Sequence, residues 1–127
     1  NYRQVWNVVG VIKCYSTYVG AKGYQKDDER FEQLREIGQE YGATTGRPRQ
    51  IDWLNLDEVI TAYQMNGVTK LIINKMDVLR QVDCTWNFYK DNILISCSDE
   101  DTFVSNIWKE VENVLPGIHI QFQGQLH

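Results

Sequence analysis

The 127-residue sequence predicts a single α/β domain with a mixed, largely parallel sheet and flanking helices. Three observations predict this class. Short apolar runs are typical of buried strands. The amphipathic segments between them begin at capping residues, and glycine or proline occurs at several of the expected ends of helices and strands. Strands and helices that alternate in this way favour a sheet with helical connections.

The first half of the chain is expected to form a strand and a helix. Val8 to Cys14 is a β-branched apolar run and predicts a buried strand, whereas the glycine-bearing segment Tyr15 to Lys26 predicts a loop. Asp27 to Tyr41 has one apolar face and an aspartate at its start, so we expect a helix there. Gly42 is the expected helix stop, and the loop after it should continue to Trp53.

The second half should alternate in the same way. Asn55 with Glu58 forms a capping-box pattern at the start of a helix that stops near Asn66-Gly67. The remaining expected elements are a buried strand at Leu71 to Ile73, a hairpin of Val82 to Tyr89 with Ile93 to Cys97 around Lys90-Asp91-Asn92, a helix opened by Ser98 with Asp101 and ended by Pro116-Gly117, and a strand at Ile118 to Phe122.

Composition excludes several classes of protein. A hydrophobic fraction of 43% with four Trp, seven Tyr and four Phe argues against disorder, and a net charge of -4 attracts neither nucleic acid nor an anionic membrane. No apolar run is long enough to span a bilayer. Cys14, Cys84 and Cys97 are odd in number and form no CxxC pair, which favours reduced thiols in a cytoplasmic protein without a metal site.

The chain begins Asn1-Tyr2-Arg3, without an initiator Met or a signal-like apolar segment. This start implies no export, and it predicts that the sequence is a piece of a longer polypeptide.

The segment Gly42 to Arg49, GATTGRPR, is the first candidate site. Two guanidinium groups, two threonine hydroxyls and several backbone amides lie within eight residues, and this combination suits a carboxylate or phosphate ligand. Pro48 stiffens the segment between Arg47 and Arg49, while its two glycines permit unusual backbone angles. The structural alternative is a solvated turn with surface arginines.

The segment Asn74 to Asp77, NKMD, is the second candidate site. It follows an apolar strand directly, and ligands of open α/β sheets collect at the carboxyl ends of strands. Asp77 can accept hydrogen bonds from N1–H and the exocyclic amine of guanine, which adenine cannot donate. The stem of Lys75 can lie along a purine. The alternative is an ordinary polar strand end.

A phosphate-binding loop of the form GxxxxGK[ST] is missing from the sequence. Val19 to Gly23 resembles one only superficially and is better interpreted as a glycine-bearing connection. The acidic runs Asp27 to Glu29 and Ser98 to Asp101 are best explained as first turns of helices, where negative charge suits the helix dipole.

Together these segments resemble the adenylosuccinate synthetase family. Gly42 to Arg49 reproduces the family's GATTGRPR loop in full, and the order and spacing of the two motifs agree with the family as well. Further similarities are those of Val9 to Thr17 with GVVKAYTTRVG, of Trp53-Leu54 with GWLDL, and of Asn66 to Val68 and Lys75 to Leu79 with NGV…TKLDVL. The resemblance is dense from Val8 to Leu79 and weak afterwards.

The resemblance implies a GTP- and Mg²⁺-dependent ligase that joins L-aspartate to a 6-oxopurine nucleotide, on a fold similar to that of phosphate-loop NTPases. The residues that it implies for aspartate binding are Ala43, Thr44, Thr45, Gly46, Arg47 and Arg49. For the purine nucleotide they are Val19, Gly20 and Arg47, and for GTP they are Arg49, Asn74, Lys75, Met76, Asp77 and Gly124. The family also implies a homodimer in the cytoplasm.

The sequence departs from the family pattern in three ways that affect the expected activity. Its phosphate loop, general-base aspartate and catalytic histidine are missing from residues 1–127, so we expect a C-terminal portion that has no catalytic residue and is inactive alone. Tyr18 replaces the usual Arg, and Lys22 to Lys26 replaces GPFPTE. The segment after Asp77 is short, as in archaeal and phage members of the family, and some phage members act on dGMP. The acceptor is therefore IMP or dGMP, and a non-catalytic guanine-nucleotide-binding module is the rival hypothesis.

Overall fold

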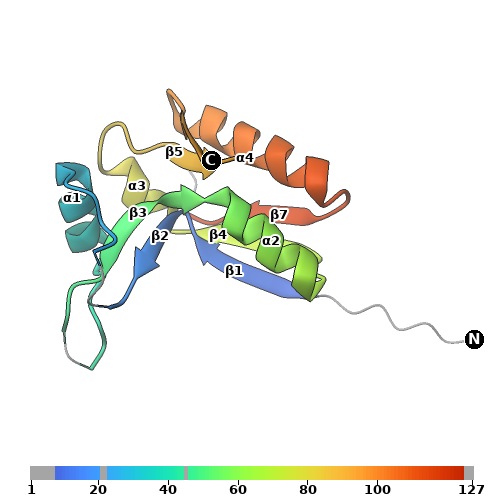
Figure 1. Cartoon of the computed structure of the whole chain (residues 1–127). Coiled ribbons are helices and arrows are strands. Elements are labelled where there is room, and N and C mark those ends of the chain that lie inside the picture. The colour runs from blue at the N-terminus through green and yellow to red at the C-terminus, as the bar shows by residue number, and fades with distance from the viewer. Residues whose placement is uncertain (1–7, 21–22, 45, 125–127) are drawn as a thin grey trace, which may run out of the picture.

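The computed structural model describes residues 8–20, 23–44 and 46–124, which form two sheets with helices around them (Figure 1). The first sheet is parallel, with the strand order β1-β4-β7, and the second is mixed, with the order β2-β3-β5-β6. The strands are β1 (Val9–Lys13), β2 (Tyr15–Tyr18), β3 (Gln50–Asn55), β4 (Lys70–Asn74), β5 (Asn87–Lys90), β6 (Ile93–Ser96) and β7 (His119–Phe122).

Four helices accompany these strands in the described residues, namely α1 (Glu29–Gly38), α2 (Leu56–Asn66), α3 (Met76–Arg80) and α4 (Glu100–Val114). Helix α1 packs against β3 and α3, whereas α2 contacts β5 and α4. The predicted α/β class is confirmed. The division of the strands into two sheets was not visible in the sequence, because it depends on which strands pair across long stretches of chain.

Aromatic side chains fill the core between the layers. Phe31 of α1 lies against Trp53 of β3, with ring centroids 4.7 Å apart. Phe103 of α4 is fully buried and contacts Trp86 at 5.3 Å and Phe88 at 6.0 Å. Burying each such side chain contributes about 1.5–3 kcal/mol, so these contacts fix α1 and α4 on the sheets.

The predicted start of α2 at Asn55 is confirmed, because the Asn55 side chain accepts a hydrogen bond from the backbone N–H of Glu58 at 3.3 Å. The reciprocal bond of a capping box is not formed, since the Asn55 N–H donates to Ser16 Oγ at 3.4 Å instead. The predicted stop of α2 is confirmed too, since Gly67 adopts the left-handed conformation at φ 62°. Asp28 caps α1. The predicted stop of α1 at Gly42 was wrong: the helix ends at Gly38, and Gln39 takes the left-handed cap at φ 53°.

Several predicted boundaries were also wrong. Tyr15–Tyr18, predicted as loop, is strand β2 because it pairs with β3, and β3 itself starts at Gln50 within the predicted loop. Helix α3 was not predicted. The hairpin is confirmed around Asp91 and Asn92, both at positive φ as in a type I′ turn. Its first strand starts only at Asn87 rather than at the predicted Val82.

The start of α4 also differs slightly from the prediction, because Asp99 rather than Ser98 caps this helix and accepts a hydrogen bond from Thr102 N–H at 2.8 Å. The strand predicted after Pro116-Gly117 is confirmed as β7.

Gly10 of β1 provides a test of the packing between α2 and the parallel sheet. A Cβ at Gly10 would lie 2.6 Å from Cζ of Tyr63 on α2. We expect Gly10→Ala to lower the free energy of unfolding by about 1–3 kcal/mol, the cost typical of overpacking. Urea denaturation measures this loss, and the additional change Tyr63→Leu should recover part of it. An equal loss with and without Tyr63→Leu would contradict the proposed contact.

Candidate functional site

The second candidate segment and the root of the first both reach the carboxyl end of β1. Lys13 lies beside Asn74 in the parallel sheet, and the backbone N–H of Cys14 donates to the Asn74 carbonyl at 3.0 Å. The Lys13 ammonium donates to Glu40, which directly precedes the GATTGRPR loop region, at 2.9 Å. One short strand end therefore connects both motifs, although more than 20 residues separate each pair of segments in the chain.

The loop from Gly42 to Arg49 is closed by its own backbone and projects from the body of the molecule (Figure 1). Gly42 N–H donates to the Arg47 carbonyl at 2.8 Å, and Gly46 N–H donates to the Gly42 carbonyl at 2.9 Å. Gly46 has φ 68°, an angle that favours glycine. Tyr41 and Pro48 form an antiparallel bridge at the base of the loop.

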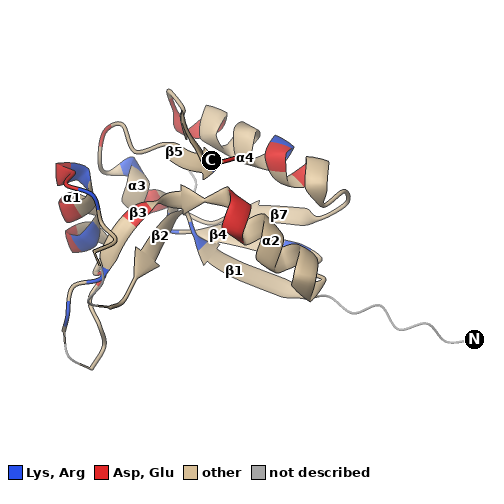
Figure 2. Cartoon of the chain, in the orientation of Figure 1, with Lys and Arg blue, Asp and Glu red and all other residues tan. Residues whose placement is uncertain are grey.

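The predicted aspartate-binding residues of this loop are mostly open to solvent. Ala43, Thr44, Gly46 and Arg47 are exposed, while Arg49 at the root is half-buried. Thr45 lies outside the described residues. Figure 2 shows basic positions on this loop, whereas helix α1 carries acidic and basic positions side by side.

A buried glutamate anchors the root of the loop. Glu40 is 2% exposed, and its Oε1 accepts hydrogen bonds from Lys13 at 2.9 Å and from Arg49 Nη1 at 3.0 Å. Its Oε2 accepts from the Tyr15 hydroxyl at 2.5 Å. The sequence did not single out Glu40. The only signal in the sequence was the position of Glu40 two residues before the predicted anion-binding loop.

The hydrogen bonds keep Glu40 ionised. Burial alone would raise the pKa of this carboxyl, but donation from Tyr15, Lys13 and Arg49 outweighs burial and lowers the pKa below its ordinary value near 4.5. Burial and the neighbouring Glu40 charge raise the pKa of Tyr15, so its hydroxyl stays a donor. Burial likewise raises the pKa of the Cys14 thiol, which leaves it a poor nucleophile.

This arrangement predicts acid sensitivity. Because the folded pKa of Glu40 lies below its unfolded value, the carboxylate stabilises the fold above pH 4.5, and that stability is lost as pH falls through the folded pKa. Glu40→Gln should cost about 1–3 kcal/mol of unfolding free energy at pH 7. Urea denaturation of both proteins from pH 7 to pH 3 should show this difference shrinking. A difference that stays constant over the whole range would contradict the prediction.

The second motif turns sharply after β4. Lys75 has φ 69°, a left-handed angle that costs energy for a residue other than glycine. This turn starts α3 at Met76, whose backbone N–H donates to the Gln123 carbonyl at 3.2 Å. Asp77 is exposed in the first turn of α3. Oδ1 of Asn74 is buried and accepts no hydrogen bond from any described residue.

Gly124 packs directly on this motif, although 47 residues separate it from Asp77. A Cβ at Gly124 would lie 2.8 Å from Oδ1 of Asp77 and 3.0 Å from its backbone N. Arg80 holds this turn in place, because it donates to the Gly124 carbonyl at 2.5 Å and forms an ion pair with Glu100 at 2.8 Å. The sequence suggested Gly124 only through resemblance and did not suggest Arg80 or Glu100.

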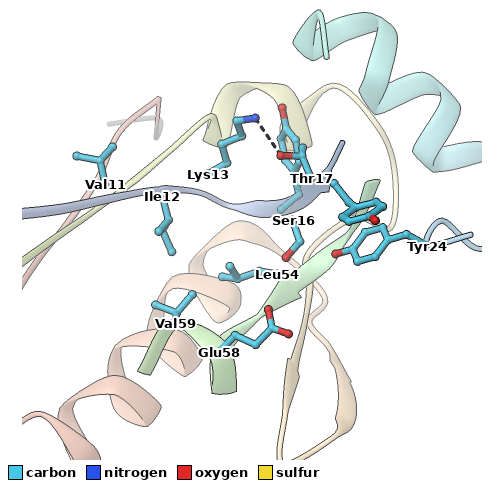
Figure 3. A pocket seen from close by; sticks show the side chains of 11 residues that line it. Val11, Ile12, Lys13, Ser16, Thr17, Tyr24, Leu54, Glu58 and Val59 are labelled. Atoms are coloured by element: carbon cyan, nitrogen blue, oxygen red, sulfur yellow. Dashed lines mark hydrogen bonds between the residues drawn. The ribbon is translucent and has the colours of Figure 1, made fainter. Parts of the chain in front are cut away.

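A cleft of about 600 Å³ opens beside the carboxyl end of β1 (Figure 3). Hydroxyl-bearing and charged side chains line it together with apolar ones, and they include Lys13, Ser16, Thr17, Tyr18, Tyr24 and Glu58. Figure 3 shows the hydrogen bond from Lys13 to Thr17, which measures 3.3 Å.

The predicted purine-nucleotide residues Val19 and Gly20 directly follow the β2 strand that lines this cleft. Val19 is 63% exposed. Tyr18 stacks on Tyr24 at 5.2 Å and covers Gly20, where a Cβ would lie 2.6 Å from the Tyr18 hydroxyl. Lys22 and Ala21, between the two tyrosines, lie outside the described residues. A tyrosine pair therefore occupies the place next to Gly20 where the resemblance places an arginine.

Among residues 8–20, 23–44 and 46–124, no group of three or more His, Cys, Asp or Glu side chains is arranged to hold a metal ion. No helix in the same ranges is long and apolar enough to cross a membrane.

Comparison with known proteins decides the family. A family model described as adenylosuccinate synthetase matches residues 1–95. The chain belongs to the adenylosuccinate synthetase family. It is similar to the adenylosuccinate synthetase of Thermodesulfovibrio yellowstonii, with 33% identity over 127 residues, and to that of Shouchella clausii, with 37% identity over 123 residues.

The chain spans only part of these synthetases. The two matches cover 96% and 90% of this chain but 28% of each relative. The chloroplastic adenylosuccinate synthetase of Ostreococcus lucimarinus is 46% identical over 83 residues, which are 64% of this chain and 19% of the relative. The similarity therefore extends over the described motifs and leaves most of each relative unmatched.

A solved structure shares the fold. The fully ligated adenylosuccinate synthetase of Plasmodium falciparum matches with a TM-score of 0.67 at 22% identity, over 92% of this chain and 37% of that chain. The arrangement of strands and helices described above is therefore an adenylosuccinate synthetase arrangement, including the segment after residue 95.

Proposed function

We propose that this chain is the C-terminal portion of a GTP-dependent ligase that joins L-aspartate to a 6-oxopurine nucleotide, with IMP as the acceptor and adenylosuccinate as the product. One observation carries the proposal: the root of the GATTGRPR loop, through the ion pairs of Arg49 and Lys13 with Glu40, and the NKMD segment, through Asn74, both reach the carboxyl end of β1. Chance motifs on an unrelated sheet would have no reason to share a strand end.

In this proposal the loop binds aspartate. Ala43, Thr44, Thr45, Gly46, Arg47 and Arg49 supply amides, hydroxyls and guanidinium groups to its two carboxylates. Arg47 also reaches the purine nucleotide, whose other contacts are Val19 and Gly20 near the cleft. The exposure of Ala43, Thr44, Gly46 and Arg47 supports this role, because a ligand can reach these residues from solvent.

The guanine base of GTP is recognised by residues at the end of β4, at the start of α3 and after β7, namely Asn74, Lys75, Met76, Asp77 and Gly124. Arg49 lies near the bound GTP. Asp77 accepts from N1–H and the amine of the base. The unusual backbone of Lys75 and the close packing of Gly124 support this assignment, since they place the Asp77 carboxylate at an open turn. The buried Asn74 Oδ1 offers an acceptor that no described residue uses.

The chemistry needs groups that we place in the remaining portion of the synthetase. The γ-phosphoryl group of GTP moves to the base oxygen, and the aspartate amine then displaces it as phosphate while forming the C–N bond. Mg²⁺ offsets phosphate charge in such a transfer, and we place its ligands mainly in that remaining portion. We therefore propose that this chain has no catalytic residue and is inactive alone, and that the complete enzyme is a cytoplasmic homodimer.

A second acceptor, dGMP, is favoured by one observation. The stacked Tyr18 and Tyr24 replace the family's arginine at the edge where the purine nucleotide is expected. A different side chain at the edge of the purine-nucleotide site is consistent with a different acceptor nucleotide. The rival function, a guanine-nucleotide-binding module without catalysis, would retain the NKMD segment and the loop but give no product.

An assay of the complete gene product tests these proposals. We expect aspartate- and GTP-dependent conversion of IMP, or of dGMP if the phage-type reaction applies. Titration of this chain with GDP and aspartate accompanies the assay. Binding without product from either acceptor would favour the rival module. The absence of both binding and product would overturn the ligase proposal.

A further inference from the structure

Glu40 joins three separate parts of the chain at one carboxylate. Lys13 reaches it from the end of β1, Tyr15 from the start of β2, and Arg49 from the root of the aspartate-binding loop. The backbone joins the same node, because Arg49 N–H donates to the Glu40 carbonyl at 2.9 Å. Arg35 of α1 completes it by donating to the Arg49 carbonyl at 2.8 Å.

Stability alone does not explain a carboxylate that is 2% exposed with two cations on one oxygen. Removing charged groups from water costs several kcal/mol, and well-packed apolar side chains often stabilise a core as well or better. A buried ion cluster does, however, fix the direction of each partner. Among the partners of Glu40, Arg49 is the one that belongs to the proposed ligand-binding loop.

Arg49 is held so that only part of its guanidinium is used. Nη1 is bound to Glu40, while Nε is buried and donates to no described residue. The Arg49 side chain is 31% exposed, so the guanidinium lies at the border between the core and the open loop. A buried donor without an acceptor is costly, and an anionic ligand at the loop root would remove that cost.

We propose that Glu40 is a positioning residue, which Lys13 and Tyr15 hold in place and which aims the Arg49 guanidinium at the anionic ligand of the loop. Gly38 leaves room for the hydrogen bond from Tyr15 to Glu40, because a Cβ at Gly38 would lie 2.5 Å from the Tyr15 hydroxyl and displace it. The inference rests on the proposed ligase function, in which that ligand is L-aspartate with GTP nearby.

The test compares variants of the complete gene product. Glu40→Gln keeps the volume and removes the charge, and Tyr15→Phe removes only the hydroxyl that holds Oε2. Asp57→Asn is the matched control, because Asp57 also pairs with a lysine and accepts backbone N–H groups, but it lies in the first turn of α2 and contacts the β5–β6 turn rather than the loop root. We measure KM for L-aspartate, GTP and the acceptor nucleotide, together with kcat.

We expect Glu40→Gln to raise KM for L-aspartate about tenfold, the effect of one weakened charge-assisted hydrogen bond. KM for GTP should rise less, and KM for the acceptor nucleotide should stay within about twofold. Tyr15→Phe should act in the same direction but more weakly, and Asp57→Asn should leave all three values unchanged. A fall in kcat with unchanged KM values would mean lost folded enzyme only and would overturn the proposal.

Hydrogen exchange gives a readout that does not need activity. In Glu40→Gln the amides of Gly42, Gly46 and Arg49 should exchange about tenfold faster, while those of α1 keep their protection. Unchanged exchange in the loop would overturn the positioning role. If the wild-type enzyme shows no activity, the proposed function fails, and the exchange result still decides whether Glu40 orders the loop.

Discussion

In the complete gene product, Asp77→Asn is expected to raise KM for GTP about hundredfold, because the change turns one of two acceptor oxygens into a donor that faces a guanine donor and removes the charge from the other hydrogen bond. Each charge-assisted hydrogen bond contributes about 1.5–3 kcal/mol, and roughly 3 kcal/mol corresponds to a hundredfold change. Asp77 is exposed at the start of α3, so we expect little loss of stability. Steady-state kinetics with GTP as the varied substrate measures the effect.

A change of nucleotide should restore the variant. Xanthine carries a carbonyl oxygen where guanine carries its exocyclic amine, so it can accept a hydrogen bond from the asparagine amide. We therefore expect Asp77→Asn to use XTP better than GTP. Asp83→Asn is the matched control, because Asp83 is also exposed and lies just beyond α3. Equal losses with GTP and XTP would contradict the assignment of Asp77 to the base.

Gly124→Ala is expected to disturb the same site through the backbone. The new Cβ would lie 2.8 Å from Oδ1 of Asp77 and 3.0 Å from its backbone N, at a residue with φ 83°. The left-handed angle costs about 1–2 kcal/mol for alanine, and overpacking adds about 1–3 kcal/mol. Because Asp77 must move, KM for GTP should rise about thirtyfold, which corresponds to roughly 2 kcal/mol.

Gly117→Ala separates these two costs. Gly117 has the same φ of 83°, but nothing lies within 4 Å of a Cβ built there. This control should lose only the backbone share of the unfolding free energy and keep the wild-type KM for GTP. Urea denaturation and GTP kinetics on both variants make the comparison. Equal effects of the two substitutions would show that Gly124 does not support the guanine site.

Local sequence signals predicted those elements that local chemistry determines. The Asn55 cap, the Gly67 stop and the Asp91-Asn92 turn each depend on side chains or backbone angles within a few residues, and all three are confirmed. Strand β2 was missed because its partner, β3, lies more than 30 residues away. Tyr15, Thr17 and Tyr18 are strand-favouring residue types, but a stretch of four residues is too short for this preference to decide without its partner strand.

The candidate site shows the same division. Each of the two segments, GATTGRPR and NKMD, is contiguous in sequence, so both could be proposed as candidate sites from residue types alone. Glu40 could not, because its importance arises from Lys13, Tyr15 and Arg49, which only the fold brings together. Arg80 and Glu100 belong to the same class, since they support Gly124 across two helices.

The most direct test of the central claim measures nucleotide dependence of ligation. The complete gene product is supplied with labelled L-aspartate, the acceptor nucleotide and GTP, ITP or ATP in separate reactions, and labelled product is quantified. We expect the highest kcat/KM with GTP, a lower value with ITP, which lacks the exocyclic amine, and the lowest with ATP. Equal values with GTP and ATP would contradict a guanine-reading portion of an aspartate ligase.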